Sequence, residues 1–203
     1  MDLKIVKSNL EQRGFTVEIF EHTNDAAEYL NTKINHTTVG LGGSVSLREM
    51  GIFDLLRKHN QVWWHNNKEQ VEEYGAFAVR EKAMNTEVYI TSVNGMTEQG
   101  QLINIDGTGN RIASTAFGHK KVFYVIGKNK IEDTLEKAMW RARNISAPKN
   151  AMRLKVNTPC AIKADRCYDC QSPERICRGF LITEYAMFGQ ETEIILVDEE
   201  LGY

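Results

Sequence analysis

Segments with the periodicity of strands and of helices alternate through residues 2–145 of this chain. Residues 122–126 (VFYVI) are apolar at every position, which is typical of a central parallel strand that is covered on both faces. Residues 132–145 follow with apolar side chains at helical spacing. This alternation predicts a layered α/β domain with a mostly parallel sheet.

The same periodicities, together with turn residues, place the other elements. We expect strands over residues 16–21, 37–41, 61–65, 87–93 and 102–106, and helices over residues 2–13, 23–34, 45–58, 68–83 and 111–117. Asn94-Gly95 predicts a tight turn. Residues 178–188 and 191–198 predict a C-terminal β-hairpin that turns at Gly189-Gln190. At 203 residues, we expect a single domain over residues 1–203 with a core large enough to need no disulfides.

The charge and hydropathy of the chain exclude several classes of protein. The formal net charge is −2 and there is no basic run, so we expect no nucleic-acid partner. The first residues, MDLKIVKSNLEQRG, lack the apolar region of a signal peptide, and no apolar stretch is long enough to predict a membrane segment. We therefore expect a cytoplasmic protein whose cysteines are metal ligands or free thiols rather than disulfides.

A glycine-rich loop over residues 40–44 (GLGGS) joins a predicted strand to a predicted helix. The backbone N–H groups of Gly42, Gly43 and Ser44 could point at one anion there, because glycines let the ligand approach closely. No Lys-Ser or Lys-Thr follows, which excludes a Walker loop, and the glycine spacing does not fit a dinucleotide fingerprint. The alternative is an ordinary βα loop in which Ser44 caps the helix.

A second loop, Asp106-Gly107-Thr108-Gly109-Asn110-Arg111, adds a guanidinium to the same kind of backbone. Arg111 could hold a carboxylate or phosphate through two hydrogen bonds. Both loops are expected at the carboxyl ends of parallel strands, where α/β sheets bind ligands. The alternative is a surface arginine that pairs with Asp106 or Glu98.

Glu98 lies between the two loops in the sequence, within Thr97-Glu98-Gln99-Gly100. A carboxylate beside an anion site could act as a general base or as a covalent nucleophile, so Glu98 is the catalytic candidate. The alternative is a solvated turn residue.

The combination of these motifs resembles the lactate-utilisation (LUD) domain family. The resemblance is carried by residues 39–44 (VGLGGS), 47–51 (LREMG), 93–104 (VNGMTEQGQLIN), 106–111 (DGTGNR) and 122–127 (VFYVIG). It implies a three-layer α/β/α fold similar to the sugar-phosphate isomerase and CoA-transferase superfamily. It also implies a link to the oxidation of L-lactate to pyruvate, beside separate iron–sulfur subunits. The resemblance assigns no catalytic residue. In CoA transferases of the wider superfamily a glutamate is the nucleophile, but Glu98 does not stand in a matching motif and that role is not carried over to it.

All four cysteines fall in one segment with the spacing Cys160-x6-Cys167-x2-Cys170-x6-Cys177. The central pair could bind one metal ion, and the flanking thiolates could complete a tetrahedral set for zinc or an iron–sulfur cluster. The segment, at residues 157–178, is expected as an insert in the domain, and it resembles that of a cysteine-containing subgroup of the family. The alternative is a set of small buried side chains or adventitious disulfides.

Three functions are compatible with these motifs. The first is an enzyme or enzyme subunit that acts on a small carboxylate or on a phosphorylated or CoA-type metabolite. The second is a metal-cluster redox accessory or assembly protein centred on the cysteines. The third is a ligand sensor without turnover. The sequence leaves open which of the three holds, and it leaves open a homo-oligomer.

Overall fold

The computed structural model describes residues 1–203 and builds them around a six-stranded sheet of order β1-β10-β7-β4-β2-β3. Every pair of neighbouring strands in this sheet is parallel. The mostly parallel sheet that the alternation predicts is therefore confirmed. Its strands are β1 (Thr16–Phe20), β2 (Thr38–Leu41), β3 (Gln61–Trp64), β4 (Val88–Thr91), β7 (Lys121–Gly127) and β10 (Glu191–Val197).

A smaller sheet of order β8-β5-β6-β9 lies against the first. Strand β6 pairs antiparallel with both β5 and β9, whereas β5 and β8 are parallel. Met96 and Leu102 of this sheet pack with Tyr124 of β7 in one apolar cluster, so the two sheets share a core. The strands are β5 (Gly95–Thr97), β6 (Leu102–Asp106), β8 (Ile131–Glu132) and β9 (Gly179–Thr183).

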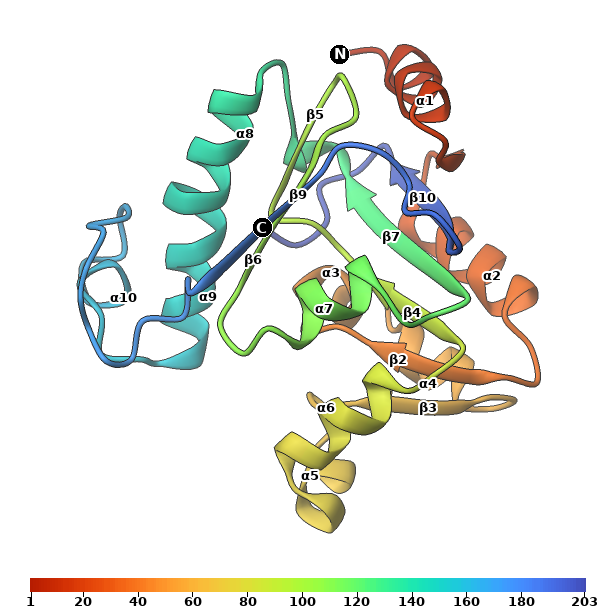
Figure 1. Ribbon diagram of the computed structural model, residues 1–203, viewed down its shortest axis with the longest axis horizontal. Coiled ribbons are helices and arrows are strands. Elements are labelled where there is room, and N and C mark those ends of the chain that lie inside the picture. The colour runs from red at the N-terminus through yellow and green to blue at the C-terminus, as the bar shows by residue number, and fades with distance from the viewer.

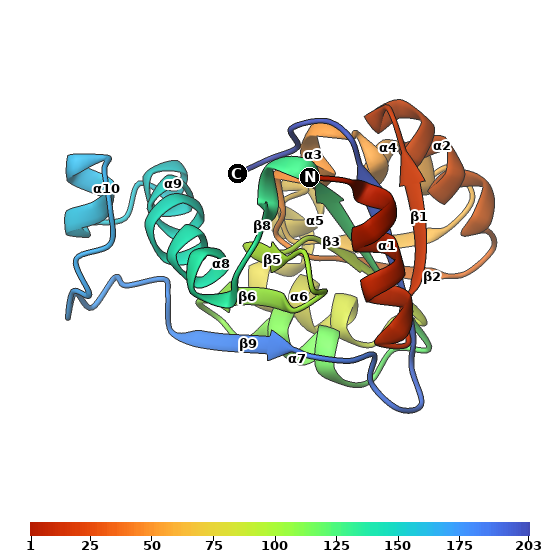
Figure 2. The same ribbon diagram turned by 90° about the horizontal axis from the view of Figure 1, so that it is seen from above.

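Helices cover both faces of the main sheet (Figures 1 and 2). Helices α2, α3 and α4 bury their apolar side chains on one face, and α1 and the small sheet lie on the other. Helices α8 and α9 then cover the outer side of the small sheet. The helices are α1 (Leu3–Gln12), α2 (Thr23–Lys33), α3 (Val45–Glu49), α4 (Ile52–Leu56), α5 (Lys68–Tyr74), α6 (Ala76–Met84), α7 (Asn110–Ala116), α8 (Leu135–Arg141), α9 (Ala147–Leu154) and α10 (Pro159–Lys163).

The predicted C-terminal hairpin is wrong. Strand β9 joins the small sheet beside β6, and β10 enters the main sheet between β1 and β7. Residues 192–197 of β10 are buried on both faces, as a strand in the middle of a parallel sheet must be. The two segments are consecutive in the chain, but each completes a different sheet.

Helices α8 and α9 form one rod that is longer than the predicted helix of residues 132–145 (Figure 1). A π-helical turn, Ala142–Ser146, joins them. Pro148 lies in the first turn of α9 and has no N–H to donate to the preceding turn, so the wider turn before it lets the rod continue. This extension carries Asn150 and Arg153 toward the carboxyl end of the main sheet.

Two smaller differences from the sequence expectations concern turns. Gly75, at a φ of +83°, divides the predicted helix of residues 68–83 into α5 and α6. The tight turn of the β5–β6 hairpin lies at residues 98–101, where Gly100 has a φ of +91°, and not at Asn94-Gly95. Asn94 instead precedes β5 and faces Ile105 of β6, whose N–H it accepts.

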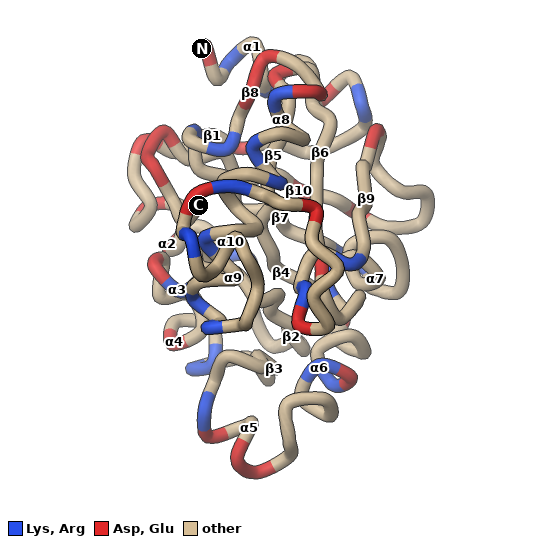
Figure 3. Tube along the Cα trace, turned by 90° about the vertical axis from the view of Figure 1, so that its left-hand side faces the viewer, with Lys and Arg blue, Asp and Glu red and all other residues tan.

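Charged residues of both signs are distributed over the whole molecule. Lys and Arg are interspersed with Asp and Glu, in keeping with the net charge of −2 (Figure 3). None of the helices combines the length and the apolar composition that crossing a bilayer requires.

Candidate functional site

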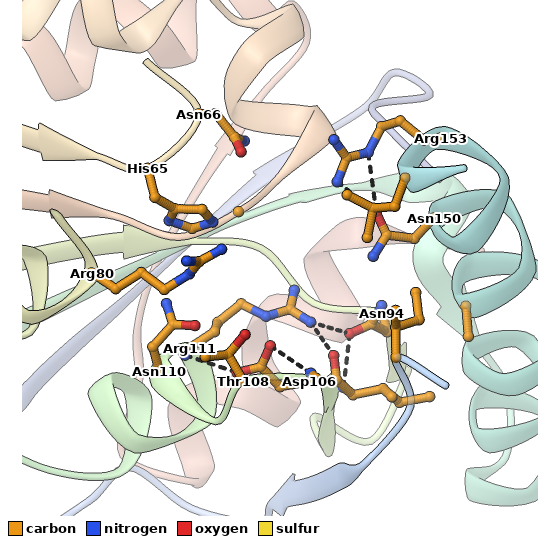
Figure 4. A pocket seen from close by; sticks show the side chains of 16 residues that line it. His65, Asn66, Arg80, Asn94, Asp106, Thr108, Asn110, Arg111, Asn150 and Arg153 are labelled. Carbon is orange, nitrogen blue, oxygen red and sulfur yellow. Dashed lines mark hydrogen bonds between the residues drawn. The ribbon is translucent and has the colours of Figure 1, made fainter. Parts of the chain in front are cut away.

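A pocket of about 310 Å³ opens where the two sheets meet α9. Residues from seven parts of the chain line it: the loops after β2, β3 and β4, helix α6, the end of β6 with the start of α7, helix α9, and the segment before β9. Figure 4 shows their side chains converging on one space. The polar side chains of this wall are those of His65, Asn66, Arg80, Asn94, Asp106, Thr108, Asn110, Arg111, Asn150 and Arg153.

Arg111 lies in the floor of this pocket and is only 9% exposed. Its Nη2 donates hydrogen bonds to Asn94 Oδ1 at 2.7 Å and to the carbonyl oxygen of Ile105. Both acceptors are neutral, and the guanidinium makes no ion pair with Asp106 or Glu98. The surface-pairing alternative for Arg111 is therefore wrong. A buried cation without a carboxylate favours an anionic ligand, because desolvation without a counter-charge is costly.

Asp106 organises the loop that follows β6. Its carboxylate accepts the N–H of Gly107 at 3.0 Å and the N–H of Arg111 at 2.9 Å. These two amides are therefore occupied by the protein itself. The loop contributes Gly107, Thr108 and Asn110 to the wall of the pocket.

The structure brings part of the two glycine loops together. Gly43 from the first loop lines the same pocket as Gly107, and a Cβ at Gly43 would lie 2.8 Å from His65 Nε2. Ser44 caps α3 by accepting the N–H of Leu47, and it lines a smaller cavity beside the pocket. Gly42 faces Thr91. The second loop follows β6, so it does not lie at the end of a parallel strand as expected.

Gly109 lies at the N-terminus of α7 with a φ of +92°, in the left-handed conformation that glycine adopts without strain. It does not line the pocket. Its role is to turn the chain from the loop into α7, which directs Arg111 inward.

Two more arginines complete the positive wall (Figure 4). Arg80 comes from α6, donates to the carbonyl oxygen of Ala76 at 3.1 Å, and has a buried Nε without a partner. Arg153 comes from α9 and donates to Asn150 Oδ1 at 2.8 Å and to Tyr203 Oη at 3.1 Å. Neither arginine makes an ion pair, so three guanidinium groups face a pocket whose single carboxylate is that of Asp106.

His65 lies between these cations at the end of β3. Burial, and then the positive charge of Arg80, lower the pKa of His65 to about 4, although Asp106 acts in the opposite direction. The imidazole is therefore neutral near pH 7. Its Nδ1 is buried and has no hydrogen-bond partner.

Glu98 is not part of this pocket. It lies in the β5–β6 turn, at the opposite end of β6 from Asp106. Its backbone carbonyl accepts a hydrogen bond from Asn9 of α1, and its N–H donates to the carbonyl of Glu132. The expectation that Glu98 sits beside the anion site is wrong, because strand β6 separates the two ends of the hairpin.

The four cysteines are free thiols and each is half-buried. No three Cys, His, Asp or Glu side chains in the chain form a group that could hold a metal ion. Cys160 Sγ shares a hydrogen bond with Thr158 Oγ1, and Cys167 Sγ accepts the N–H of Asp169. No tetrahedral set is formed by the four cysteines, Cys160, Cys167, Cys170 and Cys177. A metal centre on this segment stays a prediction from their spacing.

Several residues of the pocket are not among the site residues predicted from the sequence, and His65 is interpreted there as structural or exposed. Asn94 and His65 each follow a strand of the main sheet, and the carboxyl ends of parallel strands are where ligands bind, so this position was an available signal. Arg80 and Arg153 lie within two helices, α6 and α9, that are far apart in the sequence. No local pattern distinguishes them from surface arginines.

The family model described as the LUD domain matches residues 3–197. The chain belongs to the LUD domain family. No curated protein matches the sequence of this LUD domain. Among solved structures it is similar to a protein described as a DUF162 family protein from Deinococcus radiodurans. The TM-score is 0.52 at 10% identity, over 96% of this chain and 95% of the other, and this likeness shows the fold alone.

Proposed function

We propose that this LUD domain binds a small anionic metabolite, a carboxylate or a phosphorylated or CoA-type compound, in the pocket of Arg80, Arg111 and Arg153. One observation carries the proposal: three guanidinium groups from three separate elements face one cavity, and none is paired with a carboxylate. An anion would supply the missing counter-charge and accept the hydrogen bond that Arg80 Nε now lacks.

The pocket suits a small polar ligand rather than a large apolar one. Its wall is mostly polar. The apolar side chains in it are those of Ile105, Ala147, Leu154 and Ile176. The amides of Asn66, Asn94, Asn110 and Asn150 add donors and acceptors around the arginines. A hydroxy or oxo acid, such as the L-lactate or pyruvate that the family resemblance suggests, combines a carboxylate with such a neutral polar group.

The test is calorimetric titration of the purified chain with inorganic phosphate, L-lactate and pyruvate. Arg153→Ala and Arg80→Ala should each weaken the binding of the anion by about 1.5–3 kcal/mol, the free energy of a hydrogen bond to a charged group. These two positions are chosen because Arg111 is also part of the internal packing. Arg57→Ala is the matched control, since Arg57 is exposed and pairs with Asp54 on the surface.

Equal affinity in Arg153→Ala, Arg80→Ala and the unchanged chain would overturn the assignment of the pocket. So would a lack of measurable binding for all three anions. A mixed result, with phosphate bound and the carboxylates not bound, would retain the anion pocket and exclude the lactate link.

A further inference from the structure

Lys130 lies behind the arginine pocket, at the end of the short 3-10 turn Lys128–Lys130 that follows β7. Its side chain is 3% exposed. Its Nζ lies 2.7 Å from Ser46 Oγ and 2.9 Å from Ser92 Oγ. The polar contacts of this buried amine are thus two neutral hydroxyl groups, with no carboxylate among them.

A small cavity of about 30 Å³ brings this amine to the arginine pocket. Lys130 and Ser92 line it, and it shares Gly43, Asn94, Arg111 and Asn150 with the larger pocket. This volume accommodates one or two small groups such as a water molecule or a carbonyl group. A ligand whose charged end lies on the arginines could therefore extend its other end toward Lys130.

The surroundings of Lys130 favour its uncharged form. Burial, followed by the charges of Arg141 and Arg111, lowers its pKa to about 7, and only the more distant Glu49 acts in the opposite direction. The hydrogen bonds fit a neutral amine. Because Ser46 donates its hydroxyl proton to the carbonyl oxygen of Leu201 at 3.1 Å, its oxygen accepts from Lys130. Nζ donates its second hydrogen bond to Ser92 Oγ at 2.9 Å, and a neutral amine has the two N–H groups that these two bonds require.

We propose that Lys130 is a nucleophile that forms an imine with a small anion carrying an aldehyde or ketone group. This inference rests on the proposed function, because the arginine pocket must hold the charged end of that ligand. An uncharged lysine beside other cations is the form of this side chain that attacks carbonyl carbons. The imine would withdraw electrons from the neighbouring carbon and so permit loss of a proton there.

The step balances without any further reactant. Nζ adds to the carbonyl carbon and the C=O π pair becomes an alkoxide. The two amine protons pass to that oxygen, with Ser92 Oγ placed at 2.9 Å from Nζ to relay them. The oxygen leaves as water into the larger pocket, and the C=N bond forms.

The experiment uses the whole chain, pyruvate as the probe and sodium cyanoborohydride, which reduces an imine to a stable amine. Peptide mass spectrometry then locates the adduct. Exposed lysines are almost fully protonated at neutral pH, so we expect Lys130 to be labelled about a hundredfold faster than they are. Lys128 is the internal control, because it is two residues away, exposed and paired with Asp198. Lys130→Met should abolish the fast labelling, and Lys128→Met should retain it.

The readout does not depend on the stability of a variant, because the labelled position is read in the unchanged chain. A purely structural Lys130, which only links α3 to β4, would give no adduct. Unlabelled Lys130 in a chain that binds pyruvate calorimetrically would overturn the imine and leave the anion pocket intact. Inorganic phosphate should slow the labelling, because it competes with the carboxylate of pyruvate for the arginines. If Lys130 is labelled fast and phosphate does not slow it, the amine chemistry is upheld and the arginine pocket is overturned as the site of the ligand's charged end.

Discussion

Asn94 Oδ1 accepts a hydrogen bond from Arg111 Nη2 at 2.7 Å, and the same oxygen accepts the N–H of Ile105 at 2.8 Å. Asn94 therefore ties the guanidinium to the edge of β6. It also marks the boundary between the pocket and the small cavity of Lys130, because it lines both. The side chain of Asn94 is thus a positioning group for Arg111.

Replacing Asn94 by alanine removes the acceptor that orients Arg111. We expect Asn94→Ala to weaken phosphate binding about tenfold or more and to lower the free energy of unfolding by about 1–3 kcal/mol, since a charged donor loses its partner. Calorimetry and urea unfolding measure the two effects. Asn85→Ala, at an exposed helix end, is the control. Unchanged phosphate affinity in Asn94→Ala would contradict the positioning role.

Gly40 lets helix α6 approach the sheet and so places Arg80. A Cβ at Gly40 would lie 2.9 Å from the carbonyl carbon of Ala83 in α6. We expect Gly40→Ala to lower the free energy of unfolding by about 1–3 kcal/mol through overpacking, and to weaken anion binding because Arg80 moves with its helix. Urea unfolding and calorimetry measure these effects. A variant with wild-type stability and affinity would show that α6 adjusts without cost.

An anion in the pocket should raise the pKa of His65. In the free protein burial and Arg80 lower this pKa to about 4, and a negative charge nearby favours the protonated imidazole. Sulfate is the suitable probe because its charge stays constant between about pH 3 and pH 8, the range over which the His65 ring is titrated. Proton NMR of the His65 ring with and without sulfate measures the change. The exposed His36 serves as the internal control, and an unshifted His65 would place the anion elsewhere.

Lys130 should make the stability of the protein depend on pH. Its pKa is lowered from 10.5 to about 7 in the folded chain. Between these values the unfolded chain binds a proton that the folded chain does not, so the free energy of unfolding rises with pH. Below the folded pKa both states are protonated and the full cost of the buried charge applies.

We expect a slope of up to about 1.4 kcal/mol per pH unit between about pH 7 and pH 9 from this one group. Urea unfolding across that range measures it. Lys130→Met should lack this component, whereas Lys128→Met should keep it. Parallel stability curves for the unchanged chain and Lys130→Met would show that the amine stays protonated when buried.

Much of the framework could be read from local patterns. The apolar run of residues 122–126 is the centre of β7, and residues 102–106 coincide with β6, because burial on a strand imposes a visible periodicity. The misplaced hairpin shows the limit of such patterns. Residues 178–188 and 191–198 both favour β structure, but their partners, β6 in one case and β1 and β7 in the other, lie far away in the sequence.

Local patterns in the chain predict the alternation of elements, the family, and the position of Arg111 after a glycine loop. Packing brings Arg80 and Arg153 to the same pocket as Arg111, keeps Glu98 apart from them, and buries Lys130 between two serines. Hydrophobic periodicity is a local property and is legible in a single chain. The charge environment of a side chain depends on residues brought close by packing, and spacing along the chain does not encode that distance.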